Sequence, residues 1–154
     1  MLTTLRDAIN KGKTSNEVAP VVLNYSIQNF DNLLVDHPTL KDVKVLPNTY
    51  ITKHAFDVEV QNAFKQWELL FNSLYGEYIA LSFVKSDTTS DITISVSNIT
   101  SRVQITYGSP AIQLKSGLNW AFTGMPSGKY LLLNYLVYNI GLLLRVPRTQ
   151  KVSP

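Results

Sequence analysis

The chain has 154 residues, of which 45% are apolar and 16% are charged, and its formal charge is +3 with no cysteine. This length allows one compact domain with a core and excludes a second, and the composition is that of a folded chain. Without cysteine, neither a disulfide framework nor a thiolate metal site can form. The 14 basic side chains are spread along the chain without a dense stripe, so nucleic-acid binding is not expected.

The N-terminus carries no apolar run and no small-residue cleavage site. We therefore expect no secretory signal, and an intracellular or already processed protein. The most apolar stretch, Leu131 to Leu144, contains polar residues and is shorter than the roughly 20 residues that span a bilayer. It predicts a buried core helix, and no membrane partner is expected.

The first 16 residues are predicted to form an N-terminal helical arm, separate from a domain over residues 17–154. Leu2, Leu5 and Ile9 recur at helical spacing, and polar residues with a glycine follow up to Asn16. Such an arm can dock on its own domain or on a neighbouring copy.

Periodicity predicts the next elements of the domain in order. A strand is expected over Val21–Phe30, followed by a long connection over residues 31–54. Asp57 is expected to cap an amphipathic helix. The predicted buried face of this helix consists of Val60, Ala63, Phe64, Trp67, Leu70, Phe71 and Leu74.

The second half of the chain is predicted to hold short strands and a second helix. Residues 129–145 are apolar on all sides, which predicts a helix buried in the middle of the domain. The strands are predicted over Tyr78–Val84, Asp91–Val96, Val103–Tyr107 and Leu114–Phe122.

Two segments resemble the catalytic domain of matrix metalloproteinases, the matrixin branch of the metzincins. The first segment runs from AFKQW at residues 63–67 to IALSFVKSDTTSDITISV at residues 79–96, and the second is YLVYNIGLLLRVPRT at residues 135–149. The resemblance implies an α+β fold. In that fold a mixed, mostly parallel twisted sheet of about four to five strands carries two main helices, the second of them central and buried.

Metzincins bind zinc through HExxHxxGxxH on the second helix, where two histidines four residues apart share one face and a third follows a glycine turn. In the register given by Ile140 and Gly141, all of these positions are replaced. The first histidine corresponds to Tyr138, the glutamate to Asn139, the second histidine to Leu142, the turn glycine to Arg145 and the third histidine to Arg148.

The resemblance therefore implies a chain without catalytic residues, zinc or any other cofactor. Counterparts of the family's structural zinc and calcium sites are not expected either, because no His, Asp or Glu lies between Ile99 and Lys129. The histidines of the chain, His37 and His54, lie upstream. The family's methionine turn is expected to be missing, since the sequence ends six residues after Arg148.

The replaced positions also have structural interpretations. Tyr138 is either a core tyrosine or a relic hydrogen-bonding group, and Leu142 is interpreted as packing. Arg148 either places a guanidinium where zinc sat or is a solvated tail residue. A left-handed conformation costs a side chain about 1 kcal/mol or more. The helix is therefore predicted to end differently from the family's, with Arg145 outside a left-handed turn and the end nearer Pro147.

A chain that has the fold implied by the resemblance but lacks the zinc ligands and the catalytic glutamate is compatible with two functions. The first is a structural protein that assembles with its own copies through residues 1–16 and 149–154, as in a lattice, capsid or occlusion-type crystal of a virus. The second is a pseudoprotease that binds an extended peptide along an edge strand, as a decoy, inhibitor or adaptor. No other catalytic motif is present, so enzymatic activity is not expected.

Overall fold

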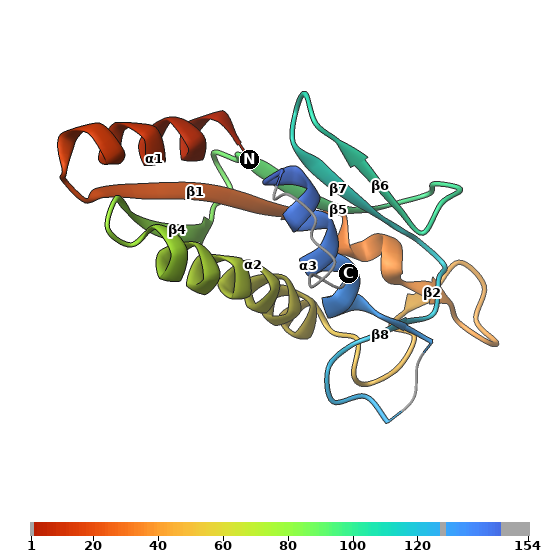
Figure 1. Ribbon diagram of the computed structural model, residues 1–154. Helices are drawn as coiled ribbons and strands as arrows, with labels where there is room; N and C mark the ends of the chain where they lie inside the picture. Colours follow the sequence, from red (N-terminus) through yellow and green to blue (C-terminus); the bar gives the residue numbers. More distant parts are fainter. Residues whose placement is uncertain (1, 127–128, 146–154) are drawn as a thin grey trace.

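A computed structural model of the protein describes residues 2–126 and 129–145 (Figure 1). Within these residues, a five-stranded sheet with the order β4-β1-β5-β7-β6 forms the centre. The elements are α1 (Thr3–Ser15), β1 (Ala19–Gln28), η1 (Phe30–Leu33, a 3-10 helix), β2 (Val35–Asp36), β3 (Lys44–Val45), α2 (Lys53–Tyr75), β4 (Ile79–Lys85), β5 (Ile92–Ser97), β6 (Val103–Thr106), β7 (Ala111–Lys115), β8 (Trp120–Ala121), β9 (Tyr130–Leu131) and α3 (Leu132–Leu143).

The central sheet is mixed and mostly parallel. β1 pairs in parallel with both β4 and β5, and β7 pairs in parallel with β5. β6 lies at the edge of the sheet and pairs antiparallel with β7. The predicted α+β class and the predicted mixed sheet of about four to five strands are therefore confirmed.

Most of the core lies between one face of the sheet and the helices α2 and α3. In β5, Ile92 and Ile94 are buried, whereas Thr93 between them is partly exposed. Tyr25 of β1 stacks on Phe64 of α2 with 4.3 Å between the ring centroids. Because successive side chains of a strand point to opposite faces, the sheet presents apolar residues to the core and hydroxyl side chains on its other face.

α2 begins earlier than predicted, and its cap is a different residue. Thr52 caps the helix, because its Oγ1 accepts a hydrogen bond from the N–H of Ala55 at 3.0 Å. The carboxylate of Asp57 instead pairs with Lys85 of β4 at 3.2 Å. The prediction of Asp57 as the cap was wrong, since an acidic residue inside the first turns of a helix resembles a cap in sequence.

The predicted buried face of α2 is only partly correct. Val60, Ala63, Phe64, Trp67 and Phe71 are buried, as predicted. Leu70 and Leu74 are not, with exposed fractions of 43% and 62%. α3 and β4 contact α2 and cover a narrower stripe than the apolar pattern suggested, so these two leucines face solvent.

α1 is one continuous helix within the helical arm predicted over the first 16 residues. Leu5 and Ile9 are buried in the same core as the sheet. Figure 1 shows α1 running along β1 on the side away from α2. A Cβ on Gly12 would lie 2.6 Å from the Cβ of Tyr78. Gly12 therefore permits close packing of α1 and does not end the helix.

Two strand boundaries differ from the prediction. β1 ends at Gln28, because Asn29 adopts a left-handed conformation with φ +60° and starts η1. The single strand predicted over residues 114–122 is divided into β7 and β8, with Gly117 at φ +73° between them. The predicted long connection over residues 31–54 holds the short antiparallel pair of β2 and β3.

α3 lies within the predicted range 129–145, but its burial is one-sided. Tyr138 and Leu142 are half-buried, although the apolar pattern predicted burial on all sides. The buried stripe of α3 consists of Leu132, Leu136, Asn139, Ile140, Gly141 and Leu143.

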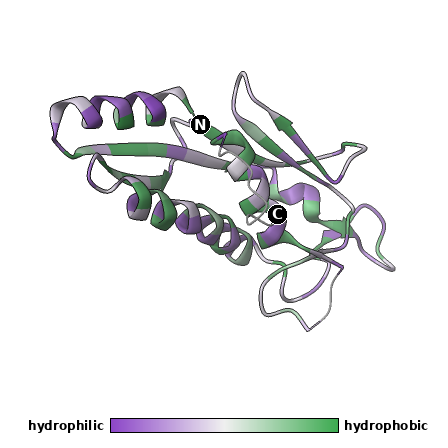
Figure 2. Cartoon of the chain, viewed as in Figure 1, coloured by the Kyte–Doolittle hydropathy of each residue, from purple (hydrophilic) through white to green (hydrophobic). Residues whose placement is uncertain are grey.

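The helices differ in hydropathy along their length. Figure 2 shows polar and apolar bands alternating along α1 and α2. Among the described residues, no helix combines the length and hydropathy that a bilayer-spanning segment needs.

Candidate functional site

Two of the positions assigned to the zinc ligands, Tyr138 and Leu142, lie on α3, and neither is a His, Cys, Asp or Glu. Tyr138 and Leu142 are half-buried side chains one helical turn apart. Asn139 is buried, and its Nδ2 donates a hydrogen bond to the backbone carbonyl of Tyr135 at 2.7 Å. The amide is therefore used within the helix. Among residues 2–126 and 129–145, no three His, Cys, Asp or Glu side chains are grouped so that they could hold a metal ion.

The end of α3 contradicts the predicted helix end. Arg145 adopts a left-handed conformation with φ +55°, and its N–H donates to the carbonyl of Leu142 at 3.0 Å. This is the conformation that a C-terminal glycine usually supplies. The prediction that arginine would avoid this turn was wrong, because a penalty of about 1 kcal/mol is small beside the packing of the helix. Pro147 and Arg148 lie outside the described residues.

Gly141 lies where α2 and α3 approach each other closely. A Cβ on Gly141 would lie 2.5 Å from Cζ2 of Trp67. The Trp67 Nε1 donates a hydrogen bond to the carbonyl of Val137 at 2.7 Å, which fixes the ring against α3. Gly141 and Trp67 thus hold α2 and α3 in close contact.

The two histidines of the chain, His37 and His54, lie outside α3. His37 lies between β2 and β3, where its Nδ1 accepts hydrogen bonds from the N–H groups of Thr39 and Leu40 at 3.1 and 3.0 Å. His54 is exposed in the first turn of α2. Neither imidazole is placed beside a serine as a general base would be.

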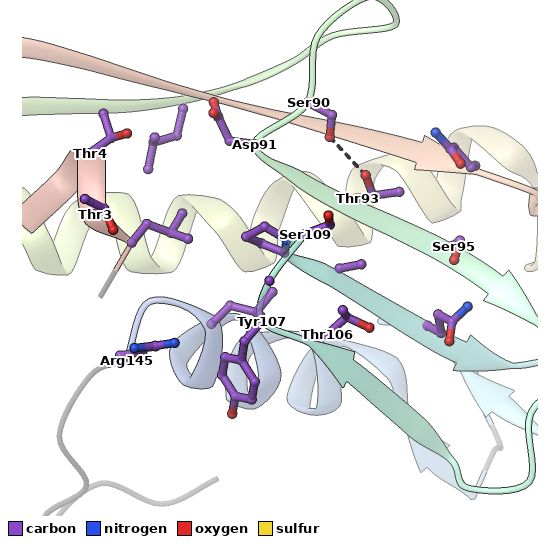
Figure 3. A pocket seen from close by; sticks show the side chains of 18 of the residues that line it. Thr3, Thr4, Ser90, Asp91, Thr93, Ser95, Thr106, Tyr107, Ser109 and Arg145 are labelled. Atoms are coloured by element: carbon purple, nitrogen blue, oxygen red, sulfur yellow. Dashed lines mark hydrogen bonds between the residues drawn. The ribbon is translucent and has the colours of Figure 1, made fainter.

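A hollow of about 870 Å³ lies at the β6–β7 turn and extends over the hydroxyl-bearing face of the sheet (Figure 3). Ser90 and Thr93 in its lining hydrogen-bond to each other at 3.1 Å, and Ser26 joins them at 3.0 Å from Ser90. No histidine belongs to the lining among the described residues. These hydroxyls pair with one another, and the carboxylate of Asp91 in the lining accepts a hydrogen bond from the N–H of Asn24 at 2.7 Å.

The sheet edge formed by β4 is closed by side chains of α2. The amide of Asn72 accepts from the N–H of Leu81 at 2.7 Å and donates to the carbonyl of Leu81 at 2.9 Å. Glu68 accepts from the N–H of Phe83 at 3.3 Å. Both backbone groups of Leu81 and the N–H of Phe83 are therefore occupied, which protects the middle of this edge from pairing with another chain.

The opposite edge, formed by β6, is open in the described part of the chain. The N–H of Lys115 donates to the carbonyl of Arg102 at 2.9 Å, which makes these two residues a hydrogen-bonded pair. Such pairs alternate along antiparallel strands, so Val103 and Ile105 direct their backbone groups outward. The carbonyl of Val103 accepts from Ser101 Oγ at 3.1 Å. No described strand pairs with the outer side of β6.

Aromatic rings and cations surround the start of β6. The guanidinium of Arg102 lies 4.7 Å from the ring centroid of Tyr130, and its Nη1 donates to the hydroxyl of Tyr135 at 3.3 Å. That hydrogen bond raises the pKa of Arg102 above its ordinary value. Lys129 Nζ lies 5.6 Å from the same Tyr130 ring, and Trp120 packs edge-on against Tyr135 at 5.3 Å.

A cation also lies at the far end of β6. Arg145 is exposed and its guanidinium is 5.5 Å from the ring centroid of Tyr107, the residue that follows the strand. Thus Arg145, which the resemblance aligned with the turn glycine, and Arg102, which sequence reasoning missed, flank one strand edge. A signal for this was present in the sequence, because all 11 acidic residues lie at or before Asp91.

Searches of protein-family models and of curated proteins give no match to this chain. The site is therefore defined by the residues and geometry of the chain itself.

Proposed function

We propose that the chain is a catalytically inactive, matrixin-derived domain that binds an extended protein segment along β6. The order of β1, α2, the four further strands of the central sheet and α3 supports the matrixin origin, since it is the order that the resemblance implies. The left-handed Arg145 supports it as well, because the turn occurs where the family places its glycine.

The substitutions on α3 support inactivity. A zinc protease needs two or three ligands and a carboxylate that activates the bound water. Tyr138, Asn139 and Leu142 supply neither the imidazoles nor the carboxylate. Asn139 is instead a buried group whose amide donates to its own helix.

The main support for peptide binding is the difference between the two sheet edges, β4 and β6. Native proteins cover or blunt exposed strand edges, because free backbone groups recruit further strands. Asn72 and Glu68 occupy backbone groups of Leu81 and Phe83 on β4, whereas no described residue pairs with the outward groups of Ile105. An extended segment that adds to β6 would satisfy these groups by β-augmentation.

Replacing Ile105 by proline should abolish binding of extended peptides, whereas Ile105→Ala should retain most of it. Both variants lose the same half-buried side chain, but only proline removes the outward N–H, and proline is tolerated on the open side of an edge strand. The measurement is binding to an array of random peptides about eight residues long, enough to cover a short strand. Circular dichroism confirms that both variants fold.

Equal binding by the proline and alanine variants would contradict the proposed mode, because the outward N–H would then play no part. Failure of the wild-type chain to select any peptide on the array would count against the proposed function itself.

Self-assembly is a second candidate, favoured by exposed leucines on α2. Leu69, Leu70 and Leu74 have exposed fractions of 60%, 43% and 62% and lie within two turns of one helix. Clustered exposed apolar side chains often mark an interface between proteins. The arm contacts once expected through residues 149–154 fall outside the described residues.

If the α2 leucines form a contact between copies, the double variant Leu70→Ser/Leu74→Ser should remain monomeric at concentrations where the wild-type chain associates. Light scattering across a concentration series measures this. The matched control is Leu40→Ser, which removes an equally exposed leucine between β2 and β3. A wild-type chain that stays monomeric at high concentration would exclude assembly.

A further inference from the structure

Charge is divided unequally along this chain. Every Asp and Glu lies within residues 1–91, whereas residues 92–145 contain four cations and no acid. The cations are Arg102, Lys115, Lys129 and Arg145. These residues build β6, β7 and α3 with their connections, so the half of the fold that carries the open edge is entirely basic.

Two of these cations flank β6. Arg102 precedes its first residue, and Arg145 stacks on Tyr107, which follows its last residue. Lys129 shares the Tyr130 ring with Arg102. At about 3.3 Å per residue, Arg102 and Tyr107 are about 17 Å apart along the strand.

These charges are not neutralised by neighbouring side chains. The three ion pairs between described residues lie elsewhere, at Lys44–Asp36, Lys65–Glu68 and Lys85–Asp57. A guanidinium has five N–H donors, and Arg102 uses one of its groups on Tyr135. The aromatic rings position the cations by cation–π contact and leave their charge available to a partner.

We infer that the segment bound along β6 is acidic, with one carboxylate at Arg102 and Lys129 and another at Arg145. This inference rests on the proposed function, because it assigns the chemistry of the partner at the same edge. In an extended chain, carboxylates that reach both ends of β6 are about five residues apart. β-branched residues between them suit the strand that would form.

Charge and backbone chemistry favour an acidic peptide at this edge over a second copy of the chain or a nucleic acid. A second copy that paired through its own β6 would bring Arg102 and Arg145 of both copies to one interface, where like charges repel. A nucleic acid complements the charge but has no peptide backbone to pair with the outward groups of Ile105.

The test uses the whole chain and two synthetic peptides. In the acidic peptide, valines and threonines separate two glutamates that are about five residues apart, and its twin has glutamine in place of both glutamates. Fluorescence anisotropy at low salt should show that the acidic peptide binds about tenfold more tightly than its twin. Arg102→Gln and Arg145→Gln should each weaken the acidic peptide about threefold and leave the twin unchanged. Lys13→Gln in α1 is the matched control and should change neither.

Equal affinity for the two peptides would overturn the acidic partner, while Ile105→Pro would still report whether β6 is the binding edge. Tighter binding of a single-stranded oligonucleotide, unaffected by Ile105→Pro, would overturn it in favour of nucleic acid. The absence of binding to both peptides would also overturn it.

Discussion

Gly141→Ala should lower the free energy of unfolding by about 1–3 kcal/mol, because overpacking at a close helix crossing forces the neighbours apart. The new Cβ would lie 2.5 Å from Cζ2 and 3.0 Å from Cη2 of Trp67. The indole cannot retreat easily, since its Nε1 donates to the Val137 carbonyl at 2.7 Å. Urea unfolding, followed by circular dichroism, measures the loss.

A double-mutant cycle tests whether Trp67 is the cause. Trp67→Phe removes the part of the indole that the new Cβ would meet, so Gly141→Ala should cost less in that background than in the wild-type chain. Gly108→Ala is the matched control, because a Cβ there meets nothing within 4 Å, and its effect should stay within about 0.5 kcal/mol. The same cost for Gly141→Ala in both backgrounds would contradict the role assigned to Trp67.

The helices and strands that show a clear apolar periodicity could be predicted from the sequence. Alternation placed β4, β5 and β6 within about one residue, and the apolar pattern found both α2 and α3. The ends of the helices were harder to predict from the sequence. Thr52 and Asp57 are both plausible caps, and the N–H of Ala55 that decides between them belongs to the folded helix.

The candidate site was less predictable, because it depends on contacts between distant residues. Whether a strand edge is open follows from the strand order and from side chains that reach across, such as Asn72 on Leu81. The hydropathy of the sequence reveals neither the strand order nor the side chains that cover an edge. The absence of acids after Asp91 was visible in the sequence, but the fold was needed to place Arg102 and Arg145 at the ends of one strand.

Arg145 was predicted wrongly for an instructive reason. Its left-handed conformation costs about 1 kcal/mol relative to glycine, and this penalty suggested a different helix end. The neighbouring Leu143 and Leu144 are completely or almost completely buried, and burying one such side chain contributes about 1.5–3 kcal/mol. The packing of the helix therefore outweighs the local strain, and the left-handed turn forms at an arginine.

The double variant Tyr138→His/Leu142→His should bind zinc and gain stability from it. The two positions are four residues apart on one face of α3, the spacing at which metzincin histidines share a metal ion. Both side chains are half-buried, so imidazoles there keep access to solvent ions. At free zinc about 100 times the dissociation constant, the gain in free energy of unfolding should be about 2.7 kcal/mol. Thermal unfolding with and without zinc measures it.

The single variants and the wild-type chain serve as controls, and zinc should not stabilise them. A double variant that folds but gains nothing from zinc would contradict the register that aligns Tyr138 and Leu142 with the metzincin ligands. Hydrolysis of peptides is not expected even with zinc bound, because Asn139 cannot act as the base that activates the metal-bound water. Asn139→Glu would bury a carboxylate at a site that is 7% exposed, which is costly without the metal ion. Restoring the ligands must therefore come before restoring the base.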